Sequence, residues 1–392
     1  MILTHVKLKN WKNFQVVDLD LSERMFIVGP NASGKSNFLD AFRFLRDIAK
    51  GTGGGLQKAI EDRGGFSTIR CYGARRNPNL EIEVKLSPAP GKPANITYSL
   101  GLTQETSGHR RPIIKYEKVV KDRKVLLSRP ELDEKKDPEL LTETYLEQTS
   151  RNREFSEVAV FFNSFCYLHL VPQLLRHPES FNGNSISEDP YGRRFLEHLA
   201  EVPDKTRIKR LKKIEKALRI VAPTLKELAF DRDGKGTPHL YARHVHWRPN
   251  AGKQSEIQFS DGTLRFIGLV WSLLERNSLL LLEEPELSLN SEIVKQIPAI
   301  LFSLANKQKC QVILSTHSWD LLSDKGIGAH EVIVLRPGQE RTDAMPLKKD
   351  KESVVLLKGG LSVAEVAVPL ATPADAIQLS LRLYEDDEEN GK

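Results

Sequence analysis

The 392-residue sequence predicts an α/β protein that combines a parallel sheet, a layer of antiparallel strands and an inserted helical lid. Three observations predict this fold. A short apolar strand at 25–28 runs into a glycine-rich loop and then an amphipathic helix at 37–45. Apolar and polar residues alternate over 80–86 and 96–102, which is the period of half-buried antiparallel strands. After about residue 240 strands and helices alternate, as in parallel sheets.

The composition is that of a soluble globular protein, with 40% hydrophobic and 28% charged residues. No apolar run approaches the roughly 20 residues that cross a bilayer, so we expect no membrane contact. The N-terminus alternates like a strand and does not resemble a signal peptide. The cysteines Cys71, Cys166 and Cys310 form no C-x-x-C pair, so neither a disulfide frame nor a zinc site is indicated. We therefore expect a cytoplasmic protein.

The charge balance permits contact with polyanions without requiring it. The chain has 58 Lys and Arg against 52 Asp and Glu, for a net charge of +6. Because the acidic run at 385–389 contributes part of the negative charge, the rest of the chain is more basic than the total indicates.

The texture of the sequence divides the chain into three parts. Residues 1–130 are expected to form an N-terminal lobe with the glycine-rich loop and the antiparallel strands. Residues 131–240 are more polar and are expected to form the helical lid, with Asp204 as the N-cap of a long helix. Residues 241–392 are expected to form a C-terminal lobe that ends in the acidic tail.

The glycine-rich loop fits the pattern G-x-x-x-x-G-K-[ST]. Its two glycines let successive backbone N–H groups approach phosphates at a helix N-terminus. Lys35 would place a charge on the β and γ phosphates, and the hydroxyl of Ser36 would bind Mg²⁺. The alternative is a glycine turn that happens to precede Lys and Ser. The residues expected to hold nucleotide here are Gly29, Pro30, Asn31, Ala32, Ser33, Gly34, Lys35, Ser36 and Asn37.

An apolar run at 279–282 ends in carboxylates. The ends of parallel strands face the crevice in which α/β sheets bind ligands. We assign Glu283 to the metal and Glu284 to the catalytic base that orients or deprotonates an attacking water. A second strand at 311–314 leads to His317, which could donate to a γ-phosphate. Without the glycine-rich loop, a solvated strand end and a surface histidine would be the simpler interpretations.

Taken together, these residues resemble the ABC-type ATPases, in the branch that includes RecF, the SMC proteins and the OLD-like, AAA-labelled ATPases of bacterial defence systems. The order along the chain matches: Walker A at 29–36, a signature-like segment at 259–264, Walker B plus catalytic glutamate at 283–284, a D-loop-like segment at 287–290 and the switch residue His317. The opening segment 8–14 also looks like the first strand and turn of that branch.

The resemblance implies a head-to-tail homodimer that binds ATP and Mg²⁺ between its subunits. The signature loop of one subunit would close on the nucleotide held by the other, and hydrolysis would release the pair. Physically, Ser260 can hydrogen-bond a phosphate oxygen or cap a helix, and Gly262 permits close backbone approach. A simple turn at Asp261-Gly262 is the alternative. The residues implied on this side are Ser260, Asp261, Gly262 and Asn290.

The sequence departs from the family pattern in places. Glu283 stands where Asp is usual, and Thr263 stands where the transporter signature has Gln. No residue could be assigned to the Q-loop, since Gln57 lies too close to the first helix. Lys12, Arg75 and Arg76 could touch nucleotide, but their spacing does not decide this.

The helix expected at 205–219 is strongly basic. Ile208, Leu211, Ile214 and Leu218 would form its apolar stripe. Seven cations crowd the other face and could neutralise nucleic-acid phosphates, although a solvated face is the simpler interpretation: Lys205, Arg207, Lys209, Arg210, Lys212, Lys213 and Lys216. The segments around Asp204 and 233–235 imitate a nuclease motif but are better interpreted as a cap and a turn. His239, His244 and His246 lack metal-site spacing.

We therefore predict an ATPase that dimerises on ATP, senses or acts on nucleic acid and controls a separate effector, a nuclease or toxin, in anti-phage defence. Two alternatives remain open: a RecF-like DNA repair or recombination ATPase, and an ATP-locked assembly scaffold with little turnover.

Overall fold

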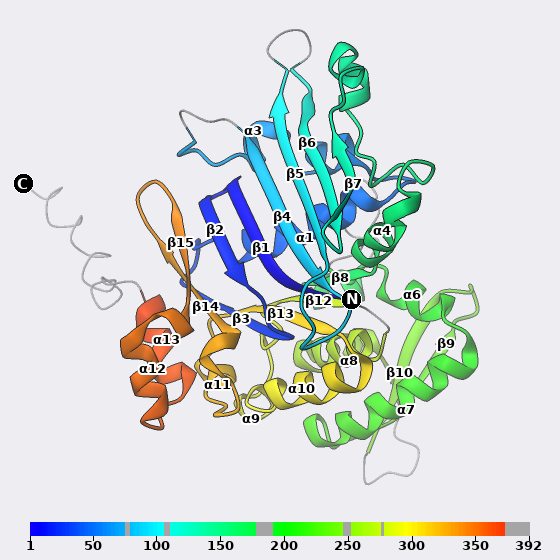
Figure 1. Cartoon of the computed structure of the whole chain (residues 1–392). Helices are drawn as coiled ribbons and strands as arrows, with labels where there is room; N and C mark the ends of the chain where they lie inside the picture. Colours follow the sequence, from blue (N-terminus) through cyan, green and yellow to red (C-terminus); the bar gives the residue numbers. More distant parts are fainter. Residues whose placement is uncertain (75–78, 106–109, 178–190, 246–251, 276–277, 373–392) are drawn as a thin grey trace, which may run out of the picture.

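The computed structural model describes residues 1–74, 79–105, 110–177, 191–245, 252–275 and 278–372. In this part of the chain the strands form three sheets. Figure 1 shows the antiparallel sheet above the mainly parallel sheet, with the third sheet in a separate lobe beside α6 and α7.

The mainly parallel sheet positions the candidate site. Its strand order is β15-β14-β3-β13-β12-β8, and the antiparallel edge strand is β15. Every residue of β3 and β13 is buried, because such a sheet is covered on both faces. The strands, in sheet order, are β15 (Thr342–Pro346), β14 (Val332–Pro337), β3 (Arg24–Val28), β13 (Gln311–Thr316), β12 (Leu279–Glu283) and β8 (Phe165–Leu168).

The antiparallel sheet has the order β2-β1-β4-β5-β6-β7. Its buried side chains, those of α1 (Lys35–Ala49) and one face of the parallel sheet form a single core cluster, so α1 is held between two sheets. Two short helices follow, α2 (Leu56–Glu61) and α3 (Phe66–Ile69). The strands are β2 (Phe14–Asp20), β1 (Ile2–Trp11), β4 (Leu80–Ser87), β5 (Ile96–Gln104), β6 (Pro112–Lys121) and β7 (Lys124–Arg129).

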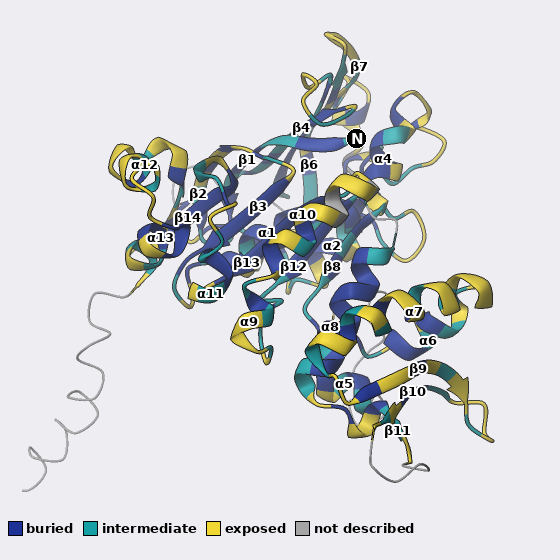
Figure 2. Ribbon diagram, turned by 90° about the horizontal axis from the view of Figure 1, so that it is seen from below, coloured by how far each residue is buried: buried dark blue, intermediate teal, exposed yellow. Residues whose placement is uncertain are grey.

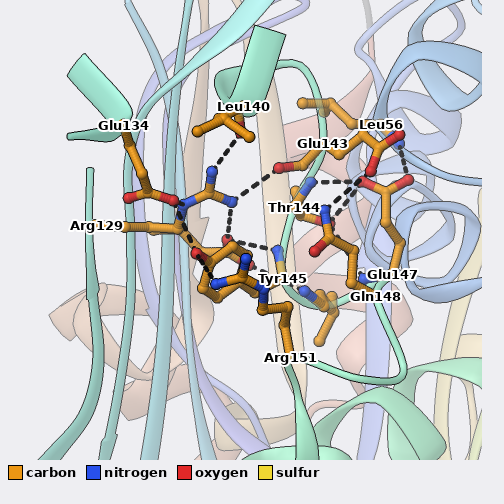
Figure 3. A network of polar contacts seen from close by, with 12 residues as sticks. Leu56, Arg129, Glu134, Leu140, Glu143, Thr144, Tyr145, Glu147, Gln148 and Arg151 are labelled. Carbon is orange, nitrogen blue, oxygen red and sulfur yellow. Dashed lines mark hydrogen bonds and ion pairs between the residues drawn. The ribbon is translucent and has the colours of Figure 1, made fainter. Parts of the chain in front are cut away.

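A buried arginine organises the segment after β7 (Figure 3). Arg129 donates to the carbonyls of Leu140 and Glu143 at 2.5 and 2.8 Å, and its guanidinium lies over the Tyr145 ring. In the same network Glu147 accepts hydrogen bonds from the Thr144 amide at 2.5 Å and from the Leu56 amide at 3.1 Å. Burial raises the pKa of Glu147 to about 7 against the opposing effect of these donors. The segment is thereby tied to the start of α2.

The region 131–240 differs from the helical lid that the sequence predicts. It holds α4 (Ser156–Asn163), α5 (Pro172–Arg176), α6 (Phe195–Glu201) and α7 (Asp204–Val221), but β8 joins the parallel sheet, and β9 (Leu225–Arg232) and β10 (Pro238–His244) pair with β11 (Lys253–Ser255). The strand β8 has only four residues and no polar alternation, so periodicity does not reveal it. The predicted cap is also wrong, because Pro203 is the N-cap and Asp204 is the first helical residue, paired with Arg207.

Helices cover the other face of the parallel sheet. Their buried and partly buried side chains pack in a second core cluster with Phe26, Leu280 and Leu314 of the sheet. These helices are α8 (Asp261–Leu274), α9 (Ser291–Val294), α10 (Ile297–Gln308), α11 (Trp319–Leu322), α12 (Lys351–Lys358) and α13 (Val363–Ala371). Within the described ranges, no helix is both long and apolar enough to span a bilayer. The predicted acidic tail lies outside the described residues.

Candidate functional site

The glycine-rich loop joins β3 to α1 and is braced by the turn between β1 and β2. Gly34 has φ +94°, and a Cβ on it would lie 2.1 Å from Nδ2 of Asn13, so only glycine fits. Asn13 donates to the Ser33 carbonyl at 3.0 Å and accepts from Asn37 at 2.8 Å. Sequence reasoning did not single out Asn13, although it belongs to the opening segment 8–14.

Lys35 and Ser36 begin α1 and point toward the acidic end of β12. Lys35 Nζ donates to the carbonyls of Gly29 and Pro30 at 3.0 and 3.2 Å and lies 3.9 Å from Oε1 of Glu284. Burial lowers the pKa of Lys35, and the nearby carboxylates oppose that shift. Ser36 Oγ donates to Oε1 of Glu283. The structure thus brings the predicted metal pair together.

The carboxylates after β12 are in three different environments. Glu283 ends the strand, whereas Glu284 has a positive φ of 43° and lies between Lys35 and His317, with Oε1 3.0 Å from Nδ1 of His317. Glu286 is buried and accepts a 2.5 Å hydrogen bond from Thr316; burial raises its pKa. Glu284 is therefore the carboxylate that faces both the loop lysine and the histidine.

The donor set at Ser36 and Glu283 fits Mg²⁺. A hydroxyl and a carboxylate are hard oxygen ligands of the kind that Mg²⁺ takes together with phosphate oxygens and water. Their two oxygen atoms already lie in hydrogen-bond contact. Within the described ranges, no group of three or more His, Cys, Asp or Glu side chains is placed so that it could hold a metal ion.

Two residues at the end of β8 complete this corner of the site. Tyr167 donates to Oε2 of Glu283, and Nδ1 of His169 lies 3.3 Å from the Glu283 carbonyl oxygen. Burial and the Glu283 charge raise the pKa of Tyr167, so its phenol stays protonated and acts as the donor. Sequence reasoning missed both residues, because only the pairing of β8 with β12 brings them to the acidic strand end.

A cavity of about 550 Å³ opens beside Ser36 and Glu283 and follows α1. Lys12 lines it, but its Nζ lies 2.7 Å from Asp40, and Arg63 donates to both oxygens of Asp40 at 2.9 Å. Burial would raise the pKa of Asp40, but Arg63 and Lys12 hold it below the usual value. Arg75 and Arg76 lie outside the described residues. Gln57 donates to the carbonyls of Pro112 and Thr142, which gives it a structural role.

The signature-like residues form a second group. Ser260 is exposed and caps α8, with the Thr263 amide donating to its Oγ at 3.2 Å. Asp261 pairs with Arg176 of α5 at 2.6 Å. A Cβ on Gly262 would lie 2.3 Å from the Ser288 carbonyl oxygen, so the signature-like and D-loop-like segments touch. Asn290 caps α9 by accepting from the Glu292 amide at 2.9 Å.

The basic helix α7 presents fewer free cations than the sequence predicts. Arg207 donates to the Val202 carbonyl at 3.0 Å and lies over the Phe230 ring, while Arg210 lies over the Trp271 ring. Both are held against the lobe because a guanidinium can stack on an aromatic ring. The predicted apolar stripe is wrong at Ile208, which is 52% exposed. Five lysines are exposed and form no ion pair within the described ranges: Lys205, Lys209, Lys212, Lys213 and Lys216. Much of the surface of α7 is exposed in Figure 2.

The rejected second sites have structural roles. Asp233 accepts from the amides of Lys235 and Thr237 at 2.9 and 2.8 Å, which closes a turn. His239 contacts Glu256 at 2.8 Å. His239 and His244 lie in β10, and His246 is outside the described residues.

Comparison with known proteins adds a family match, two partial sequence relatives and a shared fold. The family model described as "AAA domain, putative AbiEii toxin, Type IV TA system" matches residues 24–324. The chain is 29% identical over 133 residues to an uncharacterized ABC transporter ATP-binding protein, YejF, of Escherichia coli K12, which covers 34% of this chain and 24% of that protein. It is 27% identical over 97 residues to the DNA replication and repair protein RecF of Bacillus mycoides, covering 24% of this chain and 26% of RecF.

Among solved structures, an SMC head bound to the C-winged helix domain of ScpA has a TM-score of 0.52 at 13% identity. The match covers 89% of this chain and all of that one (100%). The predicted fold class and the predicted resemblance to RecF and SMC heads are confirmed. The chain spans about a quarter of the length of the two curated relatives.

Proposed function

Because the chain belongs to this AAA-domain family of ABC-type ATPases, we propose that it binds ATP with Mg²⁺ at the phosphate loop and hydrolyses it. One observation carries the proposal: Lys35, Ser36, Glu283, Glu284 and His317 meet at the carboxyl ends of β3, β12 and β13. They supply a phosphate-binding cation, two metal ligands, a base and a further donor, which is the set that phosphoryl transfer to water requires.

Each residue has a role in this mechanism. Lys35 would neutralise β and γ phosphate charge. Ser36 and Glu283 would hold the metal ion, which would supply further charge neutralisation. Glu284 orients the attacking water and accepts its proton. Glu284 contacts His317 and lies 3.9 Å from Lys35, the residue that would bind the phosphates. His317 donates to a γ-phosphate oxygen and so responds to loss of that phosphate.

The proposed assembly is a head-to-tail homodimer. Ser260, Asp261, Gly262 and Asn290 would close over ATP held by the other subunit. The exposure of Ser260 and Asn290 supports this proposal. The close approach of Gly262 to the Ser288 carbonyl also supports it, because the two loops then lie side by side.

Replacement of the proposed base tests the enzyme assignment. Glu284→Gln keeps the side-chain volume but cannot accept a proton, so turnover should fall at least about 100-fold while ATP-bound dimers accumulate. Turnover is measured by phosphate release, and dimers by light scattering with and without ATP. Glu352→Gln on α12 is the control because Glu352 is exposed and remote from the loop. A Glu284→Gln protein with the wild-type rate would refute the role of Glu284. Stable ATP-dependent dimers from a wild type with little turnover would instead favour the scaffold alternative.

We also propose that α7 contacts nucleic acid. Lys205, Lys209, Lys212 and Lys216 repeat at helical spacing on one exposed face, which suits a row of phosphates. Changing all four to Glu should weaken DNA or RNA binding at least about 10-fold and flatten its salt dependence. Fluorescence anisotropy at several salt concentrations measures both effects. Lys351 and Lys358 of α12, changed to Glu, are the control. Unchanged affinity in the α7 variant would remove this surface from the proposal.

The family description names a toxin–antitoxin system, which supports a role in anti-phage defence. Control of a separate effector, a nuclease or toxin, is a further part of our proposal. Purification with the untagged neighbouring gene products tests this, because an effector should co-elute in an ATP-dependent manner. Activity at DNA ends or gaps without any such partner would favour the RecF-like alternative.

A further inference from the structure

The two carboxylate oxygens of Glu283 have different partners. Ser36 Oγ donates to Oε1, and the phenol of Tyr167 donates to Oε2. We propose that Tyr167 is a positioning residue: it holds Oε2 so that Oε1 faces Ser36 as the metal ligand. This inference rests on the proposed function, since it assumes that Glu283 holds Mg²⁺.

Strand pairing explains how Tyr167 reaches the carboxylate. β8 runs parallel to β12, with Tyr167 opposite Leu281. Side chains two residues apart point to the same face of a strand. Glu283 therefore lies on the same face as Leu281, two residues further along β12. The long tyrosine side chain spans these two residues and reaches Glu283, whereas a shorter side chain at position 167 would end beside Leu281.

Arg43 fixes the ring of Tyr167. Its guanidinium carbon lies 4.2 Å from the ring centroid, and the Tyr167 side chain is buried, with 8% exposure. Arg43 lies two helical turns after Ser36 on α1, so the same helix carries the metal-binding hydroxyl and the clamp on the tyrosine. Ser36, Glu283, Arg43 and Tyr167 all line the cavity of about 550 Å³.

A hydrogen bond from a neutral phenol suits this task. It fixes the orientation of the carboxylate without cancelling the charge that attracts Mg²⁺. Mutation of a residue that hydrogen-bonds to a metal ligand typically lowers metal affinity about 10- to 100-fold. A tyrosine that only filled space would lack this effect, because phenylalanine would replace it at no cost to the metal.

The test is a Mg²⁺ titration of nucleotide binding by the full-length chain. A fluorescent, slowly hydrolysed ATP analogue is bound first in EDTA and then at rising Mg²⁺. Tyr167→Phe should leave the Kd in EDTA within about twofold and raise the Mg²⁺ midpoint about 10-fold. The matched control is Tyr98→Phe, which removes a phenol that donates to Glu117 at 3.1 Å within the antiparallel sheet. That control should leave the midpoint unchanged.

A double-mutant cycle adds a second readout. In a Glu283→Gln background, Tyr167→Phe should cause no further shift, because the two residues act through one ligand. The inference is overturned by an unchanged midpoint in Tyr167→Phe, by an equal shift in Tyr98→Phe, or by the same shift in the Glu283→Gln background. A melting temperature of Tyr167→Phe far below that of Tyr98→Phe would assign the phenol to stability, which also overturns it. A wild type whose nucleotide binding ignores Mg²⁺ would instead defeat the proposed function itself.

Discussion

The phosphate loop and the signature-like loop are built in opposite ways. Around the phosphate loop, Lys35 is buried, Ser36 contacts Glu283, and His317 contacts Glu284, all within one chain. Around the signature-like loop, the backbone is fixed by a helix cap, but Ser260 itself is exposed. The side chains of the first region are held by contacts within one chain, whereas the second region presents an exposed serine on a fixed backbone. This difference is what a nucleotide site completed by a second subunit requires.

The largest effects are expected for substitutions in the two loops, and together they test whether the loops belong to one composite site. Lys35→Ala should lower ATP turnover at least about 100-fold, since it removes the cation nearest the phosphates. Ser260→Asp should also inactivate, because it keeps a good N-cap while placing a negative charge toward phosphate. Phosphate release measures both, with Lys358→Ala as the control.

Mixing the two inactive variants sharpens this test. If Lys35 and Ser260 act in different subunits, half of the dimers are mixed and each contains one intact site, so about a quarter of wild-type turnover should return. No recovery would contradict the composite site, even if each variant alone behaved as expected. The experiment requires that subunits exchange, which mass spectrometry of differently tagged chains would verify.

The second effect concerns the half-buried carboxyl of Glu147, which ties the start of α2 to the segment after β7. Because burial raises its folded pKa to about 7, above the value in an unfolded chain, Glu147 adds stability that is fully present below about pH 4.5 and is lost as the pH rises through 7. The free energy of unfolding should fall by at most about 3 kcal/mol across that window.

Urea unfolding at a series of pH values measures how the free energy of unfolding falls with pH. Glu147→Gln should remove most of this fall, whereas Glu143→Gln, four residues away and exposed, should keep it. If the free energy of unfolding fell equally with pH in the wild type and in Glu147→Gln, another titrating group would be responsible for the fall.

Sequence reasoning could propose those parts of the candidate site that lie in consecutive residues. The phosphate loop needs a strand, two glycines, Lys35 and Ser36 in one order, and the acidic strand end is equally local. It failed where a role depends on which strands pair. Tyr167 lies in a four-residue apolar strand whose importance comes from its place beside β12, and Asn13 matters because its turn folds against the loop.

The cations of α7 show the same limit of sequence patterns. Helical periodicity alone places all seven on one face, whereas the structure separates the arginines from the lysines. Arg207 and Arg210 are long enough to return to the lobe and stack on Phe230 and Trp271, while the lysines extend into solvent. Helical periodicity cannot predict such stacking, because the stacking depends on aromatic residues that lie on other elements.

The smallest expected effect follows from that contrast. Arg207→Ala should lower the free energy of unfolding by about 1–2 kcal/mol, because it removes a stacked guanidinium and its hydrogen bonds to carbonyls of the α6–α7 segment. Lys209→Ala on the exposed face should change it by less than about 0.5 kcal/mol and should instead reduce nucleic-acid affinity. Urea unfolding and anisotropy, measured on both variants, separate the two roles. If Arg207→Ala were as stable as Lys209→Ala and lost as much affinity, all seven cations would form one binding face, and the structural role of Arg207 would be wrong.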